Sequence, residues 1–177
     1  MSLRISEPNI AKGLMAGLLA GFAATWVMTR FQEAWNEVQK AESKDGDKAG
    51  GTPESEQHED ETATVKTAKV ISRKVFHHEL SRKEKSVAGA ATHLGFGATV
   101  GTIYGALAEY YPAVTVGEGL GYGTAVWGLA DNVAVPTLGL SKWPTDYPLS
   151  TSVYGLSSHL VFGSTLELVR RIVRKVI

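Results

Sequence analysis

Cysteine is absent from this chain of 177 residues, and charge of neither sign is in excess. The absence of cysteine excludes disulfide bonds, thiolate metal sites and cysteine nucleophiles. The 18 basic and 18 acidic residues give a net charge of zero, so the chain as a whole has no field that would attract nucleic acid. A Gly-x-Ser-x-Gly motif, a P-loop and a dinucleotide-binding fingerprint are also missing. We therefore expect neither an enzyme nor a nucleic-acid-binding protein.

The chain does contain four long apolar segments. The mean hydropathy of -0.05 conceals them, because it averages them with a very polar stretch. Each segment approaches the roughly 20 residues that cross about 30 Å of hydrocarbon as a helix. The segments are residues 10–31, 86–108, 114–140 and 151–169. This pattern predicts an all-α integral membrane protein, a four-helix bundle that lies in the lipid bilayer.

The first segment has a second interpretation. Its apolar run, residues 13–28, follows Arg4 and Lys12, as in a secretory signal peptide. The run continues through Trp26 and Met28 without a clean A-x-A cleavage site, and three more apolar segments follow. A first transmembrane helix with its extension, residues 1–36, is therefore the better interpretation.

The connection between the first two segments is polar and has two parts. Residues 37–63 are rich in charge and contain three Gly and one Pro, which predicts a flexible linker. Residues 64–85 place apolar residues at helical spacing among basic ones, which predicts an amphipathic helix. We expect this helix to lie on the membrane surface rather than to pack on the helix ends. Residues 86–177 then supply the other three transmembrane helices.

The third apolar segment is the least regular of the four. Asp131, Asn132 and Pro136 interrupt it. Polar residues and proline are tolerated at membrane depth where the chain is kinked or lines a cavity. We therefore expect this segment to be kinked or partly re-entrant.

An internal repeat relates the segments in pairs. Residues 93–99 (HLGFGAT) and 159–165 (HLVFGST) share five of seven residues. Residues 24–26 and 125–127 match more weakly, through Ala and Trp. Together the matches predict two helical hairpins inserted the same way round, related by a pseudo-twofold axis along the membrane normal, with both termini on one side.

Glycines recur in these segments, mostly at four-residue spacing. Such ridges allow helix backbones to approach closely, because contact area drives helix association where lipid supplies no hydrophobic force. They predict tight packing within the bundle. The glycines are Gly13, Gly17 and Gly21, then Gly89, Gly97, Gly101 and Gly105, and finally Gly117 and Gly121.

Four ionisable residues form the candidate site. His93 and His159 are equivalent in the repeat, and Arg30 and Asp131 each lie four residues after an aligned Trp. We predict that the four share one depth as a buried polar layer, which is costly in a membrane and hence a functional candidate. Two interpretations stay open. In the structural one, Asp131 pairs with Arg30 and the histidines bond across helix contacts; in the functional one, the layer relays protons. In either case Asp131 should have a partner or a water molecule beside it, and Arg30 or a histidine is the candidate partner.

Cofactor chemistry has less support than either of these interpretations. A bis-histidine haem site would need the two histidine-bearing helices held apart, whereas glycines flank both residues. A metal site of His93, His159 and Asp131 has suitable ligand types, but no helix carries a His-x3-His or Glu-x2-His pair. We therefore expect no cofactor and no metal.

Several short motifs resemble the YagU-like family of small bacterial inner-membrane proteins. They are residues 109–112 (EYYP), 127–131 (WGLAD), 135–139 (VPTLG) and 159–163 (HLVFG). The resemblance covers the second to fourth segments and implies a multi-pass protein of the bacterial inner membrane with a cytoplasmic C-terminus. It implies no activity, because that family has none that could be transferred. Basic residues near the segment ends divide six against five between the two sides, so only the resemblance indicates sidedness.

Two classes of function are compatible with these features. The first is an interaction or accessory component of the membrane, as a homo-oligomer or as a subunit of a larger complex. The second is a small proton-coupled transporter or channel-like conduit that uses the buried layer. We prefer the first, because a small bundle packed through glycines leaves little room for a wide pore.

Overall fold

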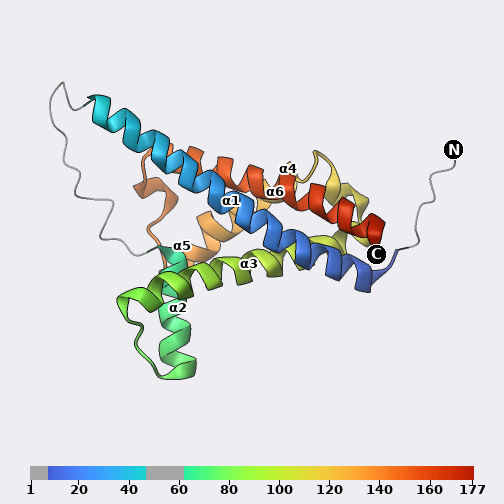
Figure 1. Ribbon diagram of the computed structural model, residues 1–177, viewed down its shortest axis with the longest axis horizontal. Helices are drawn as coiled ribbons and strands as arrows, with labels where there is room; N and C mark the ends of the chain where they lie inside the picture. Colours follow the sequence, from blue (N-terminus) through green and yellow to red (C-terminus); the bar gives the residue numbers. More distant parts are fainter. Residues whose placement is uncertain (1–7, 47–61) are drawn as a thin grey trace.

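The computed structural model describes residues 8–46 and 62–177, and within these ranges every regular element is helical, as predicted (Figure 1). The six α-helices are α1 (Ile10–Gly46), α2 (Ala63–Ile71), α3 (Arg82–Tyr110), α4 (Leu120–Val126), α5 (Val135–Thr137) and α6 (Leu149–Val176). π-Helical turns follow α2 (Ser72–Phe76) and α4 (Trp127–Ala134), and 3-10 turns occupy Pro112–Thr115 and Pro144–Asp146.

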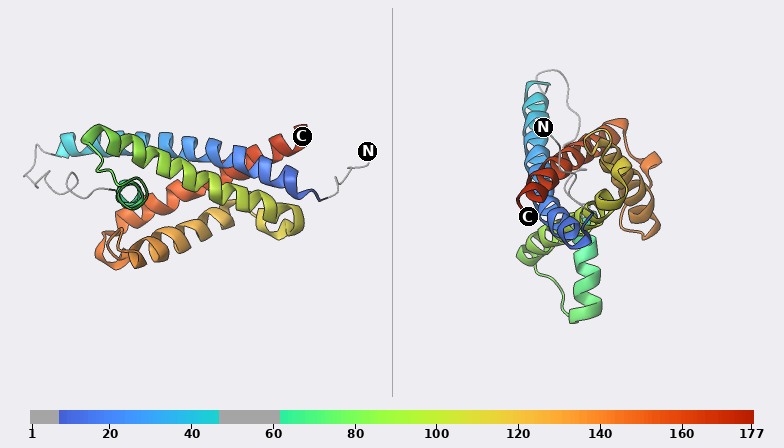
Figure 2. Two further views of the ribbon diagram at one scale, coloured as in Figure 1. Left: turned by 90° about the horizontal axis from the view of Figure 1, so that it is seen from below. Right: turned by 90° about the vertical axis from the view of Figure 1, so that its right-hand side faces the viewer.

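Four helical segments run lengthwise and alternate in direction: α1, α3, the continuous α4 to α5 segment, and α6 (Figures 1 and 2). α1 packs against α3 and α6, and α4 packs against α6. The start of α1 and the end of α6 lie at the same end of the bundle. There Glu109 accepts hydrogen bonds from the backbone N–H of Asn9 at 2.8 Å and from Arg174 Nε at 2.6 Å. This up-down order is the one expected of two hairpins with the same orientation.

Close helix contacts form through glycine backbones. A Cβ atom added at Gly101 would meet Gly21 Cα at 2.6 Å, and one added at Gly105 would meet Gly17 Cα at 2.7 Å. The second hairpin is packed in the same way, through Gly119 and Gly123 on the α4 side and Gly163 on α6. The ridge predicted at Gly117 and Gly121 is different, because Gly117 faces open space and Gly121 has only a distant neighbour.

Small residues fill much of the bundle interior, and many large apolar residues lie on its outside. Ala16, Ala20 and Ala24 are fully buried on α1. The larger apolar residues that are buried are Met28, Tyr104, Phe162 and Leu166. Exposed large residues occur on every long segment: Met15, Leu19, Phe22 and Trp26 on α1, Phe96 and Ile103 on α3, Leu129 and Val133 after α4, and Leu168 and Ile172 on α6.

Among the described helices, α1 is the one that is long and apolar enough to cross a membrane by length and composition, over Ile10–Ala41. A signal sequence or the buried helix of a soluble protein has the same two properties. Composition and length therefore indicate one possible span and do not establish the predicted bundle of four. The third segment is divided among α4, a π-helical turn and α5, so no single α-helix of that length exists there.

The polar connection differs from its predicted division. α1 continues to Gly46, through the first ten residues assigned to the linker, and residues 47–61 of the linker lie outside the described part. The predicted helix of residues 64–85 is two elements, because the chain turns at His77, whose φ is +53°. α3 begins after Ser81, whose hydroxyl and backbone N–H form a capping box with Glu84.

Candidate functional site

The centre of the candidate site is the contact between Asp131 and His159. Asp131 lies in the π-helical turn Trp127–Ala134, and its Oδ2 is 3.6 Å from Nε2 of His159 on α6. The His159 side chain is 8% exposed, whereas the Asp131 side chain is 47% exposed. One partner thus faces the bundle interior, and the other also faces its outside.

The hydrogen bonds of His159 determine what this contact can bind. Nδ1 lies 2.9 Å from the carbonyl oxygen of Gly155, and a carbonyl only accepts, so Nδ1 carries a proton and donates it. In the neutral ring Nε2 is then an acceptor, and it faces the Asp131 carboxyl group. Two acceptors do not attract each other, so a proton on either Nε2 or the carboxyl group would make the contact favourable. At 3.6 Å the two atoms are too far apart for a direct hydrogen bond, and the pair is a candidate site for one proton.

The backbone at Asp131 is irregular. Asn132 Nδ2 donates to the carbonyl oxygen of Trp127, five residues earlier, at 2.9 Å. Pro136, just after the turn, has no N–H to donate to the preceding turn. π-Helical turns are rare and are frequent at functional sites. The irregularity of the third segment is thus a widened helical turn that carries Asp131.

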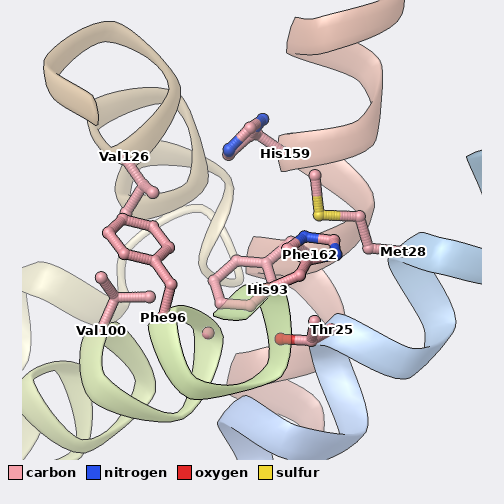
Figure 3. Close-up of a pocket in the computed structure, with 9 residues that line it drawn as sticks. Thr25, Met28, His93, Phe96, Val100, Val126, His159 and Phe162 are labelled. Atoms are coloured by element: carbon pink, nitrogen blue, oxygen red, sulfur yellow. The ribbon is translucent and has the colours of Figure 1, made fainter. Parts of the chain in front are cut away.

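A small cavity lies beside His159 at the centre of the bundle (Figure 3). Its volume is about 20 Å³, close to the space that one water molecule needs. His93 from α3 and His159 from α6 both line it, as Figure 3 shows, so the structure brings these two predicted site residues together. The other lining residues are Thr25, Met28, Phe96, Gly97, Val100, Val126 and Phe162. A cavity of this size accepts a water molecule and is far too small for a haem.

Arg30 is not part of this group, and the predicted pairing of Arg30 with Asp131 is not what the structure shows. Its Nη1 is 2.7 Å from Glu33 Oε2, and its guanidinium lies 5.7 Å from the centroid of the Trp26 ring. The reason is the register of the weaker repeat match. In the packing, Gly21 of α1 lies against Gly97 of α3 just as Gly119, before α4, lies against Gly163 of α6, so Gly21 corresponds to Gly119. The Trp alignment instead pairs Gly21 with Tyr122.

A second polar cluster was not predicted. Glu167 on α6 is completely buried, and its carboxylate accepts hydrogen bonds from Tyr104 Oη at 2.8 Å and from Arg170 Nε at 2.7 Å. Arg171 bonds the same carboxylate at 2.5 Å and also bonds Glu118 at 2.6 Å. The sequence signal was Glu167 with two arginines three and four residues later, on one helix face. Because every buried charge in the cluster has a partner, the cluster is a structural tie among α3, α6 and the turn before α4.

Within residues 8–46 and 62–177, no three His, Asp or Glu side chains lie close enough together to hold a metal ion. His78, on the polar connection, is exposed and lies 3.4 Å from Glu84. Both side chains lie on a solvated face.

Comparison with known proteins gives a family but no activity. Residues 55–168 match the family model described as "Protein of unknown function (DUF1440)". No curated protein and no solved structure is significantly similar to the chain. The match begins before α2, ends at residue 168 within α6 and includes Asp131, His93 and His159. It covers more than half of the chain, and the protein therefore belongs to this family of unknown function.

Proposed function

We propose that this chain is a multi-pass membrane protein of the bacterial inner membrane, that its four lengthwise segments cross the bilayer, and that it acts as an accessory component of a membrane assembly. The inner-membrane location rests on the resemblance to the YagU-like family. The four crossings rest on the distribution of side chains, and the assembly role rests on Asp131.

The distribution of side chains supports membrane insertion of all four segments. In water, large apolar side chains are stabilised by burial and small ones fill gaps. Here fully buried alanines and glycines form the helix contacts of the first hairpin, and residues such as Trp26, Ile103 and Leu168 lie outside. Helices that pack in lipid have this composition, because close backbone contact replaces the hydrophobic force.

The contacts of α1 support a retained helix rather than a removed signal peptide. Gly13, Gly17 and Gly21 lie directly against the backbone or side chains of α3, and α6 packs on another side of α1. Loss of α1 would expose the glycine face of α3, which has no side chains to cover its own backbone. The first hairpin thus depends on α1.

The single observation that supports an assembly role is the exposure of Asp131. Its side chain is 47% exposed although the residue lies within an apolar segment. A charged aspartate at the middle of a membrane costs about 2.5–3.5 kcal/mol even on the lenient insertion scale. The pair with His159 reduces this penalty on one side only. A polar group of another subunit on the exposed side would remove the remainder.

The experiment is purification from membranes in a mild detergent, with the molar mass measured by light scattering. We expect a particle larger than the single chain of 19.0 kDa. Asp131→Leu should dissociate it. Thr99→Leu is the matched control, because Thr99 is exposed on α3 and its hydroxyl bonds only its own helix, at Gly95. A stable monomer for the unaltered chain, or equal loss of mass in both variants, contradicts the proposal.

A second candidate function is proton-coupled transport, which the proton site at Asp131 and His159 beside a water-sized cavity favours. In that case a purified monomer in liposomes would move protons, and Asp131→Asn would abolish the movement without unfolding the chain, because the amide cannot titrate. In the accessory role, the unaltered protein shows no such movement.

A further inference from the structure

We propose that α2 and the turn that joins it to α3 form a binding surface for anionic phospholipid headgroups. We call this the α2 surface and define it as residues 62–87. The inference rests on insertion of the chain in a membrane, and it is independent of the assembly role.

The position of α2 along the bundle is fixed by its contact with α3. A Cβ atom added at Gly89 would meet Val65 Cγ2 at 2.7 Å, and Ala68 of α2 is buried. Gly89 is three residues inside the second apolar segment, which corresponds to about 5 Å of helix. α2 therefore lies at the depth where hydrocarbon gives way to headgroups.

The orientation of α2 is that of a helix in the membrane plane. Figure 2 shows α2 end-on in the view where the four long segments run across the picture, and it extends outward from the bundle in the other view. Because the long segments define the membrane normal in our proposal, α2 lies parallel to the bilayer surface. It projects over the lipid beside the bundle rather than over the bundle itself.

The side chains of the α2 surface are apolar and basic. Val70, Ile71, Val75 and Val87 are exposed, with Val75 at 63%. Basic residues outnumber acidic ones by seven to two: Lys66, Lys69, Arg73, Lys74, Arg82, Lys83 and Lys85 against Glu79 and Glu84. Apolar side chains that enter the headgroup boundary, together with an excess of positive charge, are typical of helices that bind anionic lipid.

The two carboxylates of the α2 surface offset only part of its positive charge. Arg73 Nη2 lies 2.9 Å from Glu79, and this arginine holds the pKa of Glu79 below its usual value. The pKa of Glu84 is lowered by its hydrogen bonds with Ser81 in the capping box. Both stay ionised near neutral pH, so five positive charges remain in excess.

A groove on this surface has a lining that suits a lipid molecule. It has a volume of about 380 Å³, and its walls are Leu80, Val87 and Ala88, with Lys83 and Glu84 beside them. An acyl chain matches the apolar walls. A lipid phosphate then lies within reach of Lys83, and charge complementarity selects an anionic headgroup over a zwitterionic one.

The test uses the full chain in nanodiscs of phosphatidylglycerol or of phosphatidylcholine with the same acyl chains. Because the chain has no cysteine, Val75→Cys gives a single site for an environment-sensitive fluorophore. We expect a blue-shifted emission that lipid-borne quenchers reduce. A label that is equally exposed to water in both lipids overturns the inference.

Competition between the two lipids in mixed nanodiscs measures the charge contribution. Each basic residue near a membrane surface contributes about fivefold in affinity for anionic lipid, or about 1 kcal/mol. Lys74→Gln with Lys83→Gln should therefore reduce the enrichment of phosphatidylglycerol around the protein by about fivefold to 25-fold. The matched control is Lys40→Gln with Lys44→Gln, which removes the same charge from the end of α1, about 13 Å or more beyond the first apolar segment. Equal enrichment for the two double variants contradicts the inference, whereas failure of the chain to enter nanodiscs contradicts membrane insertion itself.

Discussion

The contact of Gly105 with α1 allows a quantitative test of the helix packing. A methyl group at this position would lie 2.7 Å from Gly17 Cα and 2.8 Å from Gly17 N, and closer still to the carbonyl oxygen of Gly13. Ordinary contacts begin near 3.4 Å, so α1 and α3 would have to separate locally by about 0.7 Å or more. The opposing atoms are backbone and cannot rotate away. Overpacking of this kind costs about 1–3 kcal/mol.

Gly95 on the same helix is the matched control, because a methyl group added there meets nothing within 4 Å. Both substitutions to alanine gain the same intrinsic helix propensity, about 1 kcal/mol. The difference between Gly105→Ala and Gly95→Ala therefore isolates the helix contact. We expect Gly105→Ala to be less stable than Gly95→Ala by about 1–3 kcal/mol in unfolding by SDS titration from mixed micelles. Equal stability of the two variants would refute the close packing of α1 on α3.

Three other predictions concern charges. Glu167→Ala leaves buried arginine charge without its partner and should destabilise the fold by about 3–5 kcal/mol in the same assay, against less than about 1 kcal/mol for the exposed Glu33→Ala. Arg174 lowers the pKa of Glu109. The stabilisation from this pair is therefore complete at neutral pH and is lost as the pH falls below the ordinary carboxyl pKa of 4.5. Thermal unfolding of Glu109→Gln should lack this part of the acid dependence. With α2 on the membrane surface, basic residues near the membrane are more numerous at the end of the bundle that carries α2 than at the end that carries both termini. Because basic residues favour the cytoplasmic side, a reporter fused after Ile177 should read non-cytoplasmic, the opposite of what the resemblance implies. A cytoplasmic signal would show that the end with α2 faces outward.

Much of the helical architecture could be predicted from apolar segment lengths and glycine spacing. The segments 86–108 and 151–169 lie within α3 and α6, and the spacing of Gly13, Gly17 and Gly21 forms the observed contact with α3. These features are local, because the periodicity of glycines along one helix determines which of its faces allows close backbone contact. The register between two helices depends on both chains at once, and a match of two residues in three was too short to fix it. For this reason the predicted pairing of Arg30 with Asp131 is wrong.

The candidate site shows the same distinction. His93 and His159 could be related by a match of five residues in seven, and both line the central cavity. A histidine was one of the two partners expected for Asp131, and His159 is the one that lies beside it. The sequence did not predict the π-helical turn that carries Asp131, because such turns have no simple sequence code. The sequence also does not predict the burial of Glu167, because a carboxylate near the end of a helix ordinarily faces water.

The central claim is that four segments cross the membrane, and it depends most on the third and least regular of them, residues 114–140. The most direct test is the accessibility of two single cysteines on either side of this segment in intact cells. Ala113→Cys lies in the turn between α3 and α4, and Thr145→Cys lies in the turn between α5 and α6; both positions are exposed, and the chain has no cysteine of its own. A membrane-impermeant maleimide should label one of the two in intact cells and the other only after the membrane is permeabilised. Equal labelling of both before permeabilisation would contradict the account.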